Sequence, residues 1–543
     1  MERTLLKNAR VVDGTGHPPF PGHVYIEGNR IGAVLRQGQP LPQADRELDV
    51  AGRDVAPGFI DMHSHADFLV PVESQAELLR GLLEQGVTTV IAGNCGISPA
   101  PVRPATRNRL SSFASIAIDA PLDWGWRGVG EYLERVQRAR PAVNVAQLVG
   151  HGALRHAGAD TRRGDLSESE VRRCLDEARQ AFDQGACGLS FGLGYDPGMY
   201  SSLQELEAFS RVAAEAGKPV TVHLKAYSRL SPCYPLTDLS AHNLRALREM
   251  LDVAARADAR LQISHLIFVG RRSWSSAPAA IAMIDRARAR GQDVAFDAFP
   301  YTCGNTTINA LLPYWFLALG SEGFESRLAR ARLRLEAEVG FRLVGFSYDD
   351  FQVMEIAVPE WEHLDGSTVA EIAERWGTSS FDAMLRIAQR SQGAALMLFH
   401  AYSGDRQGRG PIDDVIAHEA CLYETDAIVR SKGWPNPAAV GTFPKILGDH
   451  VRRRRRLSLE EAVRRMTWAS AERFGITDRG RIADGQAADL VIYDPEMVGD
   501  APPQAGRPAG RPRGIDHVFV NGVHAVVDGA YQLDQRAGRV LPA

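Results

Sequence analysis

Residues 55–65 read VAPGFIDMHSH, a continuous apolar run that ends in two histidines. Such a run is typical of a parallel strand that is buried on both faces. Similar runs follow, separated by helical segments, at 87–95, 143–152, 186–195, 218–226, 259–266, 293–302 and 419–427. An open α/β sheet would show the same alternation, but eight strands favour closure. We therefore predict an α/β fold, a (β/α)8 TIM barrel.

Both ends of the chain have a different pattern. Residues 1–56 and 478–543 contain short β-rich runs joined by Asp-Gly and Asn-Gly pairs, which are hairpin signals. We expect these two segments to form one small β-sandwich domain, and the catalytic barrel to occupy 57–477. A barrel needs roughly 250 residues, so a chain of this length has room for both.

A long insertion interrupts the alternation at 306–395, between the seventh and eighth strands. It carries two helical segments, ESRLARARLRLEAEV and STVAEIAERWG, and a strand-like piece, FQVMEIAV. A long segment after a barrel strand lies over the active-site mouth. Both a mobile lid and a stabilising flap fit this position.

The composition is that of a globular protein, with 24% charged residues and a net charge of −4. This balance gives no reason to expect a nucleic acid or an anionic membrane as partner. The arginine run at 452–456 precedes an amphipathic helix and is expected to be its solvated start. The N-terminus lacks a secretory pattern, and six cysteines in so long a chain do not suggest a disulfide framework. A cytoplasmic location is expected, and a homo-oligomer is possible.

Metal-ligating residue types stand at the C-terminal ends of five of the predicted strands, where barrel enzymes carry their chemistry. His63 and His65 end the first strand and point to the same side, because side chains two residues apart share a face. Cys95 ends the second strand, and a thiolate is a ligand suited to zinc. The others are His223, His265 and Asp426, which end the fifth, sixth and eighth strands. Each alone is more often structural, but together they predict a zinc site.

Several motifs surround these residues: APGFIDMHSHAD (56–67), AGNCGISPAP (92–101), LVGHGALR, GLSFGLGYDPG, GTFPKILGDHVR, and ADLVIYDP and AGRVL in the tail. The set resembles the amidohydrolase superfamily, and within it the D-aminoacylase (N-acyl-D-amino-acid deacylase) family. The resemblance implies that Cys95, His223 and His265 hold a tightly bound zinc ion. It also implies a second, weaker or optional position at His63, His65 and Asp426, with Cys95 within reach of both.

The resemblance further implies a small-molecule amide substrate and hydrolysis of its C–N bond. A metal-bound hydroxide would attack the carbonyl, while Asp426 serves as general base and then as general acid. Two alternatives stay open at this point. One is a cyclic amide hydrolase of the hydantoinase and dihydroorotase type. The other is a non-catalytic scaffold, which the complete set of ligand residues disfavours.

The sequence departs from the family at positions that serve the substrate's carboxylate. Ile267 stands in place of a lysine, while Phe299 and Asn305 stand in place of a tyrosine and a serine. Desolvating a charged group without partners costs several kcal/mol, so we expect a substrate without the usual free α-carboxylate. Further candidate substrate contacts are Lys225, Arg272, Tyr301, His151 and His400, and Arg155 is one more cation that could replace the lysine.

Overall fold

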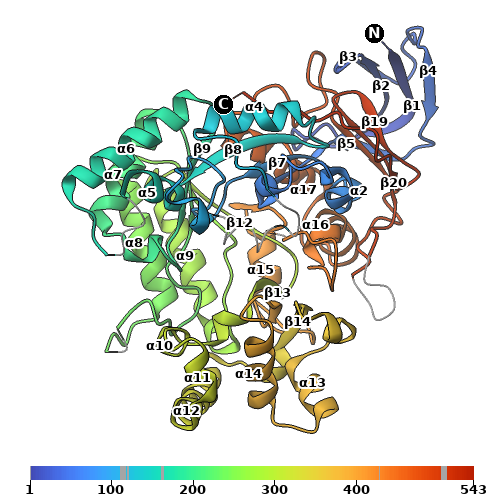
Figure 1. The fold of residues 1–543 in the computed structure, drawn as a ribbon. Helices are drawn as coiled ribbons and strands as arrows, with labels where there is room; N and C mark the ends of the chain where they lie inside the picture. Colours follow the sequence, from blue (N-terminus) through green and yellow to red (C-terminus); the bar gives the residue numbers. More distant parts are fainter. Residues whose placement is uncertain are drawn as a thin grey trace.

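Eight parallel strands form the centre of the computed structural model, which describes residues 2–110, 118, 122–159, 164–235, 237–426, 428–502 and 510–542 (Figure 1). They are β6 (Phe59–Ser64), β7 (Val87–Ala92), β8 (Asn144–Gly150), β9 (Gly188–Gly192), β10 (Val220–His223), β11 (Leu261–Ile263), β12 (Val294–Ala298) and β16 (Cys421–Tyr423). They hydrogen-bond in the order β16-β12-β11-β10-β9-β8-β7-β6. Each predicted run contains one of them, so the predicted barrel is confirmed.

Contacts beside the first and last strands close the ring. The backbone N–H of Asp426 donates to the carbonyl of His63 at 3.0 Å. One residue earlier, the N–H and hydroxyl of Thr425 both donate to the carboxylate of Asp61, at 2.9 and 2.6 Å. The end of β16 is thereby fixed to β6, although these residues lie more than 350 positions apart in the sequence.

Helices surround the barrel. They are α1 (Gln75–Leu78), α2 (Arg80–Glu84), α4 (Val129–Arg138), α5 (His151–Ala159), α6 (Glu168–Asp183), α7 (Leu203–Glu215), α8 (His242–Ala257), α9 (Ala277–Ala289), α15 (Ile412–Ala417), α16 (Ala438–Lys445), α17 (Leu459–Met466) and α18 (Trp468–Arg473). In α6, Ser167 and Glu170 form a capping box that satisfies the first backbone N–H groups. Its residues Cys174, Ala178 and Ala181 recur at helical spacing and are buried.

Segments from both termini form the small domain at the upper right of Figure 1. Its strands are β1 (Arg3–Val11), β2 (Phe20–Glu27), β3 (Arg30–Arg36), β4 (Arg46–Asp49), β5 (Asp54–Pro57), β17 (Leu490–Tyr493), β18 (Ile515–Val520), β19 (Val523–Val527) and β20 (Ala530–Tyr531). They hydrogen-bond as one continuous sheet, because β5 pairs directly with β17. This sheet has its own apolar core, which includes Leu6, Val24 and Leu490. The limits at residues 56 and 478 stay a prediction.

The insertion follows β12 and occupies the lower part of Figure 1. It comprises β13 (Cys303–Thr307), α10 (Tyr314–Leu317), α11 (Ser321–Glu325), α12 (Arg327–Val344), β14 (Phe351–Glu355), α13 (Val369–Trp376), α14 (Ser380–Arg390) and β15 (Leu396–His400). The two predicted helical segments overlap α12 and α13, and the strand-like piece contains β14. Strands β13 and β15 flank the predicted range. With β14 they form an antiparallel sheet in the order β13-β15-β14. The polar sequence of β13, CGNTT, gives no reason to expect a strand with so distant a partner.

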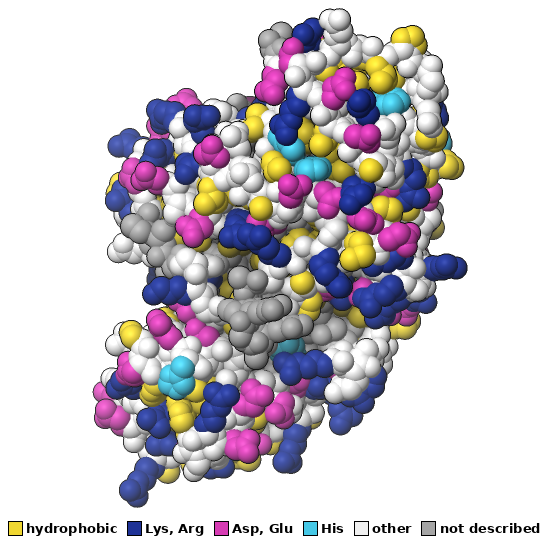
Figure 2. Space-filling view, turned by 90° about the vertical axis from the view of Figure 1, so that its right-hand side faces the viewer, with side chains coloured by type: hydrophobic (Ala, Val, Ile, Leu, Met, Phe, Trp, Pro, Cys, Tyr) yellow, Lys and Arg dark blue, Asp and Glu magenta, His cyan; other side chains and the backbone are white. Residues whose placement is uncertain are grey.

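Charges of both signs are interspersed over the face shown in Figure 2. The arginine run at 452–456 ends the π-helical segment η7 (Ile446–Arg453) and precedes α17. Its exposed members Arg454 and Arg456 form ion pairs with Asp413 and Asp414. None of the described helices has the length and apolar character needed to cross a membrane.

A buried carboxylate joins the small domain to the barrel. Asp489, just before β17, accepts hydrogen bonds from the side chain of Asn144 on β8, at 3.0 Å, and from the backbone N–H of Asn521, at 2.6 Å. It also pairs with Arg479, whose side chain is 2% exposed. This network fixes the two domains against each other.

Removing the carboxylate should therefore destabilise the whole protein. We expect Asp489→Ala to lower the free energy of unfolding by about 3 kcal/mol, because it removes the buried counter-charge of Arg479 and leaves only the exposed Asp478 beside it. Guanidinium unfolding followed by tryptophan fluorescence measures this loss. Glu496→Ala, an exposed change nearby, should stay within about 0.5 kcal/mol of wild type. Equal stability of the two variants would contradict the assignment.

Candidate metal centre

The thiol of Cys95 lies at the centre of the cluster of predicted ligands. Its Sγ is 3.2 Å from His63 Nε2, 3.7 Å from His223 Nδ1 and 3.5 Å from His265 Nε2. The structure thus brings residues from the ends of four strands to one sulfur atom.

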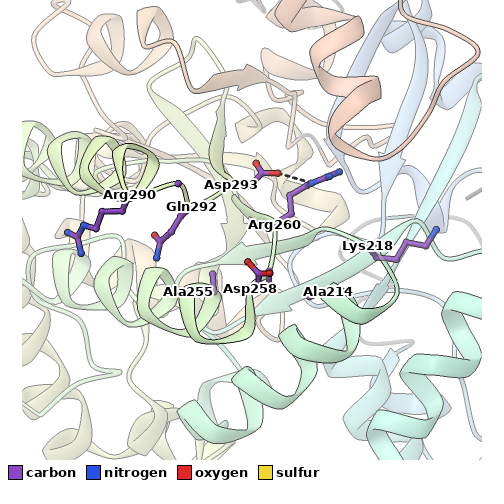
Figure 3. Close-up of a pocket in the computed structure, with 12 residues that line it drawn as sticks. Ala214, Lys218, Ala255, Asp258, Arg260, Arg290, Gln292 and Asp293 are labelled. Carbon is purple, nitrogen blue, oxygen red and sulfur yellow. Dashed lines mark hydrogen bonds and ion pairs between the residues drawn. The ribbon is translucent and has the colours of Figure 1, made fainter.

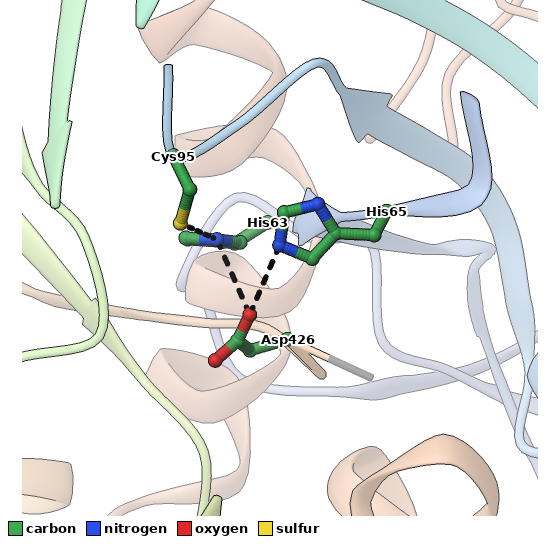
Figure 4. A group of neighbouring side chains, drawn as sticks. All are labelled: His63, His65, Cys95 and Asp426. Atoms are coloured by element: carbon green, nitrogen blue, oxygen red, sulfur yellow. Dashed lines mark hydrogen bonds and ion pairs between the residues drawn. The ribbon is translucent and has the colours of Figure 1, made fainter. Parts of the chain in front are cut away.

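Two groups of potential ligands share this sulfur. In one group, His223 Nδ1 and His265 Nε2 lie 3.0 Å apart and both face Cys95. In the other, Asp426 Oδ1 lies 3.4 Å from His63 Nε2 and 3.3 Å from His65 Nε2 (Figure 4). The donor atoms within each group all lie within 4.8 Å of one another. All six predicted ligands therefore occupy one place, in the two sets that the sequence analysis proposed.

The backbone is strained where three of these residues leave their strands. Cys95 has φ 57°, His265 has φ 31° and Asp426 has φ 42°. Non-glycine residues rarely adopt such left-handed conformations, and they concentrate at functional sites. Here the positive φ turns each side chain out of the strand alternation and into the mouth of the barrel.

The electrostatics of the cluster favour an anionic sulfur. Burial raises the pKa of the Cys95 thiol. The charge of His63 and hydrogen bonds from His223, His265 and His63 outweigh this effect, so the pKa lies well below its usual value. Burial likewise raises the pKa of Asp426, whereas the charges of His265 and His63 lower it more. Both side chains are therefore expected to be anions, which is the form that binds a cation.

Three buried carboxyl groups that the sequence analysis did not single out surround the cluster. Asp297 Oδ1 accepts the backbone N–H of His265 at 2.6 Å and lies 3.4 Å from His63 Nδ1. Glu424 is fully buried near the same histidine, and neither of its oxygens has a hydrogen-bond partner among the described residues. Burial raises the pKa of Asp61 to about 7. Strand alternation offered a signal for Asp61, which stands two residues before His63.

The glycine-rich segment at the end of β9 and in the loop after it packs closely against Cys95. The hydroxyl of Tyr195 donates to the carbonyl of Cys95 at 2.6 Å. A Cβ atom at Gly192 would lie 2.0 Å from that carbonyl oxygen, and one at Gly194 would lie 2.9 Å from His223 Nε2. The sequence GLSFGLGYDPG is therefore needed for close approach of this loop to the candidate ligands.

Comparison with known proteins identifies the family. A model of the amidohydrolase family matches residues 46–332 and 430–526. The chain belongs to the amidohydrolase family. N-acyl-D-glutamate deacylase of Alcaligenes xylosoxydans xylosoxydans is 34% identical over 542 residues, which cover 99% of this chain and 96% of that protein. D-aminoacylase of the same organism is 29% identical over 542 residues, covering 99% and 97%.

A solved structure agrees with this placement. N-acyl-D-glutamate deacylase from Bordetella bronchiseptica, complexed with zinc and a phosphonate mimic of the tetrahedral intermediate, has a TM-score of 0.79 at 30% identity. The match covers 99% of each chain. The predicted kinship with the D-aminoacylases is confirmed over the full length of this amidohydrolase.

Four of the proposed substrate contacts face other parts of the amidohydrolase. Lys225 Nζ lies 5.5 Å from the ring of Tyr234, because β10 ends at His223 and the strand alternation stops there. Arg272 is exposed on η3 (Arg271–Ser276). His151 is fully buried, with Nε2 2.9 Å from Glu205 Oε1. His400 lies in the insertion, 2.9 Å from Gln352 Oε1, and burial lowers its pKa to about 4.

Arg155 also has partners within the protein, among them Glu205, whose Oε1 lies 3.5 Å from its Nε. Its guanidinium is buried and donates to the carbonyls of Pro197 and Gly164, at 2.8 and 2.7 Å. It therefore supports the loop that carries Tyr195 and does not provide a free cation for a substrate.

Three of the remaining proposed contacts form one apolar wall beside the end of β12, and the fourth, Asn305, is polar. Phe299, Tyr301 and the partly buried Ile267 pack together with Met354 and Trp434. The hydroxyl of Tyr301 donates to Asp500 at 3.0 Å. Asn305 accepts a hydrogen bond from the side chain of Asn436 at 2.6 Å.

The loop that follows Asp426 is docked on the edge strand of the insertion. Arg430 donates to both oxygens of Glu355 on β14, at 2.8 and 3.2 Å, and the two side chains are only 9% and 17% exposed. The backbone N–H of Trp434 donates to the carbonyl of Met354 at 2.6 Å. A Cβ at Gly433 would lie 2.3 Å from the same carbonyl oxygen. The insertion is therefore clamped to the segment beside the candidate centre.

A separate cavity of about 490 Å³, shown in Figure 3, lies at the end of the barrel opposite the candidate metal centre. Lys218, Arg260 and Asp293 line it and lie within two residues of the starts of β10, β11 and β12. Residues at the amino ends of barrel strands serve stability in enzymes of this fold. We therefore assign this cavity no part in the chemistry.

The clamp generates a prediction that needs no substrate. Glu355→Gln should speed hydrogen exchange at the backbone N–H of Trp434 roughly 10- to 100-fold, because a charge-assisted hydrogen bond contributes about 1.5–3 kcal/mol. Mass spectrometry of peptides covering 430–434 measures this rate. The control is Glu360→Gln, which removes an exposed ion pair with Arg390 in the same insertion. Equal protection in the two variants would show that the clamp does not hold the loop.

Proposed function

We propose that this protein is a zinc-dependent hydrolase of linear C–N amide bonds, similar in chemistry to the N-acyl-D-amino-acid deacylases. The observation that carries the proposal is the sharing of one sulfur atom, Cys95 Sγ, by two sets of ligand atoms. The full-length similarity to deacylases supports the same reaction class.

The donor set fits zinc. It combines an anionic sulfur, imidazole nitrogens and a carboxylate, which are the ligand types that zinc takes in proteins. In this proposal Cys95, His223 and His265 hold the tight zinc, while His63, His65 and Asp426 complete a second position that also uses Cys95. When bound, zinc supplies Lewis acidity, which lowers the pKa of coordinated water and polarises a carbonyl group.

Asp426 is the proposed proton carrier. The charges of His265 and His63 keep its pKa low, so the carboxylate is ready to accept a proton from the attacking water. The protonated carboxyl group then donates to the leaving nitrogen. Its position is fixed by its own backbone bond to His63 and by the adjacent bonds between Thr425 and Asp61.

The carboxyl groups Asp297 and Glu424 lie beside His63, and Asp297 is the one that contacts the candidate ligands. Asp297 holds the backbone of His265 and lies beside the far nitrogen of the His63 ring. Outer carboxylates of this kind fix the orientation of a ligand imidazole and make it a better donor.

The substrate in this proposal lacks the usual free α-carboxylate. Ile267 and Phe299 contribute apolar surface where the family places polar groups, and Arg430 is already neutralised by Glu355. Lys225 and Arg155 have the other contacts described above. A desolvated carboxylate at this wall would therefore have no counter-charge from these residues.

The insertion is proposed to be a fixed wall of the mouth. The Arg430–Glu355 pair clamps it near Asp426. A second ion pair joins Arg271 of η3 to Asp350, with both terminal guanidinium nitrogens bonded, at 2.6 and 2.8 Å. Two such pairs hold the insertion against the barrel on two sides, which favours a flap over a lid that opens in each cycle.

Asp426 provides the first test. Asp426→Asn should lower kcat for amide hydrolysis by about 100- to 10,000-fold, the usual contribution of a general base. Zinc content, measured by plasma mass spectrometry, should stay at the wild-type level for the tight position. The control is Asp413→Asn at the surface, which should keep full activity. Near wild-type turnover by Asp426→Asn would refute the assignment.

Metal removal gives a second test. Dialysis against a chelator should abolish hydrolysis, and added Zn²⁺ should restore it, because the donor set requires a cation for activity. Cys95→Ala should fail to recover under the same treatment. A metal-free protein that keeps full activity would contradict a zinc mechanism.

A substrate screen tests whether the preferred substrate lacks a free α-carboxylate. N-acyl-D-amino-acid carboxamides should be hydrolysed with kcat/KM at least about ten-fold above the matching free acids, since desolvating the carboxylate is unfavourable here. Cyclic amides belong in the same screen. Faster turnover of the free acids would reject the proposed substrate, and selective cleavage of cyclic amides would replace the linear assignment.

A further inference from the structure

Tyr227, in the loop that follows β10, packs against both histidines of the proposed tight zinc position. The centroid of its ring lies 4.9 Å from that of His223, at an interplanar angle of 88°, and 5.0 Å from that of His265, at 60°. Edge-to-face arrangements are favoured between aromatic rings. Tyr227 is only 8% exposed, so packing fixes its orientation. One ring therefore contacts the two imidazoles that are proposed to hold the same cation.

The hydroxyl of Tyr227 bonds to the backbone beside each of these histidines. It accepts the N–H of Leu224, which directly follows His223, at 2.9 Å. It also donates to the carbonyl of Ser264, which directly precedes His265, at 2.9 Å. A single hydroxyl thus links the two peptide segments that carry the proposed ligands.

These bonds extend the connection between the two strands. The last paired residues of β10 and β11 are Val222 and Ile263, so the strand pairing ends just before the histidines. Ser264 adds one backbone bond, from its N–H to the carbonyl of Val222 at 2.9 Å. Beyond it, the hydroxyl of Tyr227 joins the two segments, and its carbonyl accepts the N–H of Val269 at 3.0 Å. The loop after β10 is thereby fixed to the segment after β11.

His265 needs such support because its backbone is strained. Its φ of 31° is unfavourable for a residue other than glycine and persists only where the surroundings fix it. Asp297 holds the N–H of His265, and Tyr227 holds the carbonyl of the residue before it. No described residue bonds to His265 Nδ1, the nitrogen through which a ligand imidazole is usually oriented. The ring contact with Tyr227 supplies that orientation here.

We propose that Tyr227 is the positioning residue of the tight zinc position, and that it sets His223 and His265 at the distance needed to share one cation. The inference rests on the proposed function, which assigns these two histidines and Cys95 as ligands. In the structure His223 Nδ1 and His265 Nε2 lie 3.0 Å apart, and both face Cys95 Sγ. A site that is arranged before its ligand arrives binds more tightly, since less order has to be imposed on binding.

Zinc affinity, measured without any substrate, is the direct test. Chelator-stripped protein is titrated with Zn²⁺ in competition with a chromophoric chelator. Tyr227→Phe keeps the ring and loses both hydrogen bonds, so it should weaken zinc binding at the tight position about ten-fold. Tyr227→Leu also loses the ring and should weaken it about 100-fold. Zinc affinity at the second position should stay at the wild-type level, because the ring and hydroxyl of Tyr227 contact the tight set and its neighbours.

Tyr234→Phe is the matched control. Tyr234 belongs to the same loop, is 6% exposed and donates to Glu249 at 2.6 Å, so this change also removes the hydrogen bond of a buried hydroxyl. Its ring lies against His242, which is not a proposed ligand. The control should therefore keep wild-type zinc affinity, even where its thermal unfolding temperature falls as far as that of Tyr227→Phe.

Cobalt gives a second readout, because Zn²⁺ has a filled d shell and no visible spectrum. The visible bands of Co²⁺ bound in place of zinc depend on the arrangement of the ligands, so Tyr227→Leu should shift them and Tyr234→Phe should not. Wild-type protein that binds no zinc would refute the proposed function itself. If wild-type protein binds zinc, and both Tyr227 variants match its affinity and its cobalt spectrum, the positioning role alone is overturned. An equal loss of zinc affinity in Tyr227→Phe and Tyr234→Phe would also overturn it.

Discussion

The hydrogen bond from the backbone N–H of Asp426 to the carbonyl of His63 is the contact on which the site depends. It joins the ends of the first and last barrel strands, and the bonds between Thr425 and Asp61 reinforce it. Without this closure His63 and Asp426 would belong to opposite edges of an open sheet. The ring places them 3.4 Å apart, which makes one cluster from residues at five strand ends.

Burial then sets the chemistry of that cluster. Four histidines surround one thiol and one carboxylate, and the positive charge available on the rings lowers the pKa of both acids against the effect of desolvation. An assembly of buried anions and imidazoles of this kind suits a divalent cation, which supplies the missing charge. Two further carboxyl groups, Asp297 and Glu424, are buried beside the ring of His63 and add to the negative charge of this region.

The insertion contributes to the site through its edge strand. Strand β14 pairs with β15 on one side, while Gly366 and Ser367 bond to Val353 and the loop that follows Asp426 bonds to Met354. Covering an edge strand with a loop satisfies its backbone groups and also orders the loop. One contact thus serves both the stability of the insertion and the shape of the mouth.

The sequence by itself determined the eight strands and the six candidate ligands, because buried parallel strands have a continuous apolar pattern and barrel chemistry lies at their ends. It could not place Lys225, since alternation stops where β10 ends and the side chain turns toward Tyr234. Nor could it find β13 and β15, or the pairing of Arg430 with Glu355, whose partners lie 75 positions apart. Only the tertiary structure decided these features. The periodicity of a sequence indicates which face of an element is buried, but it does not indicate which distant residue that face contacts.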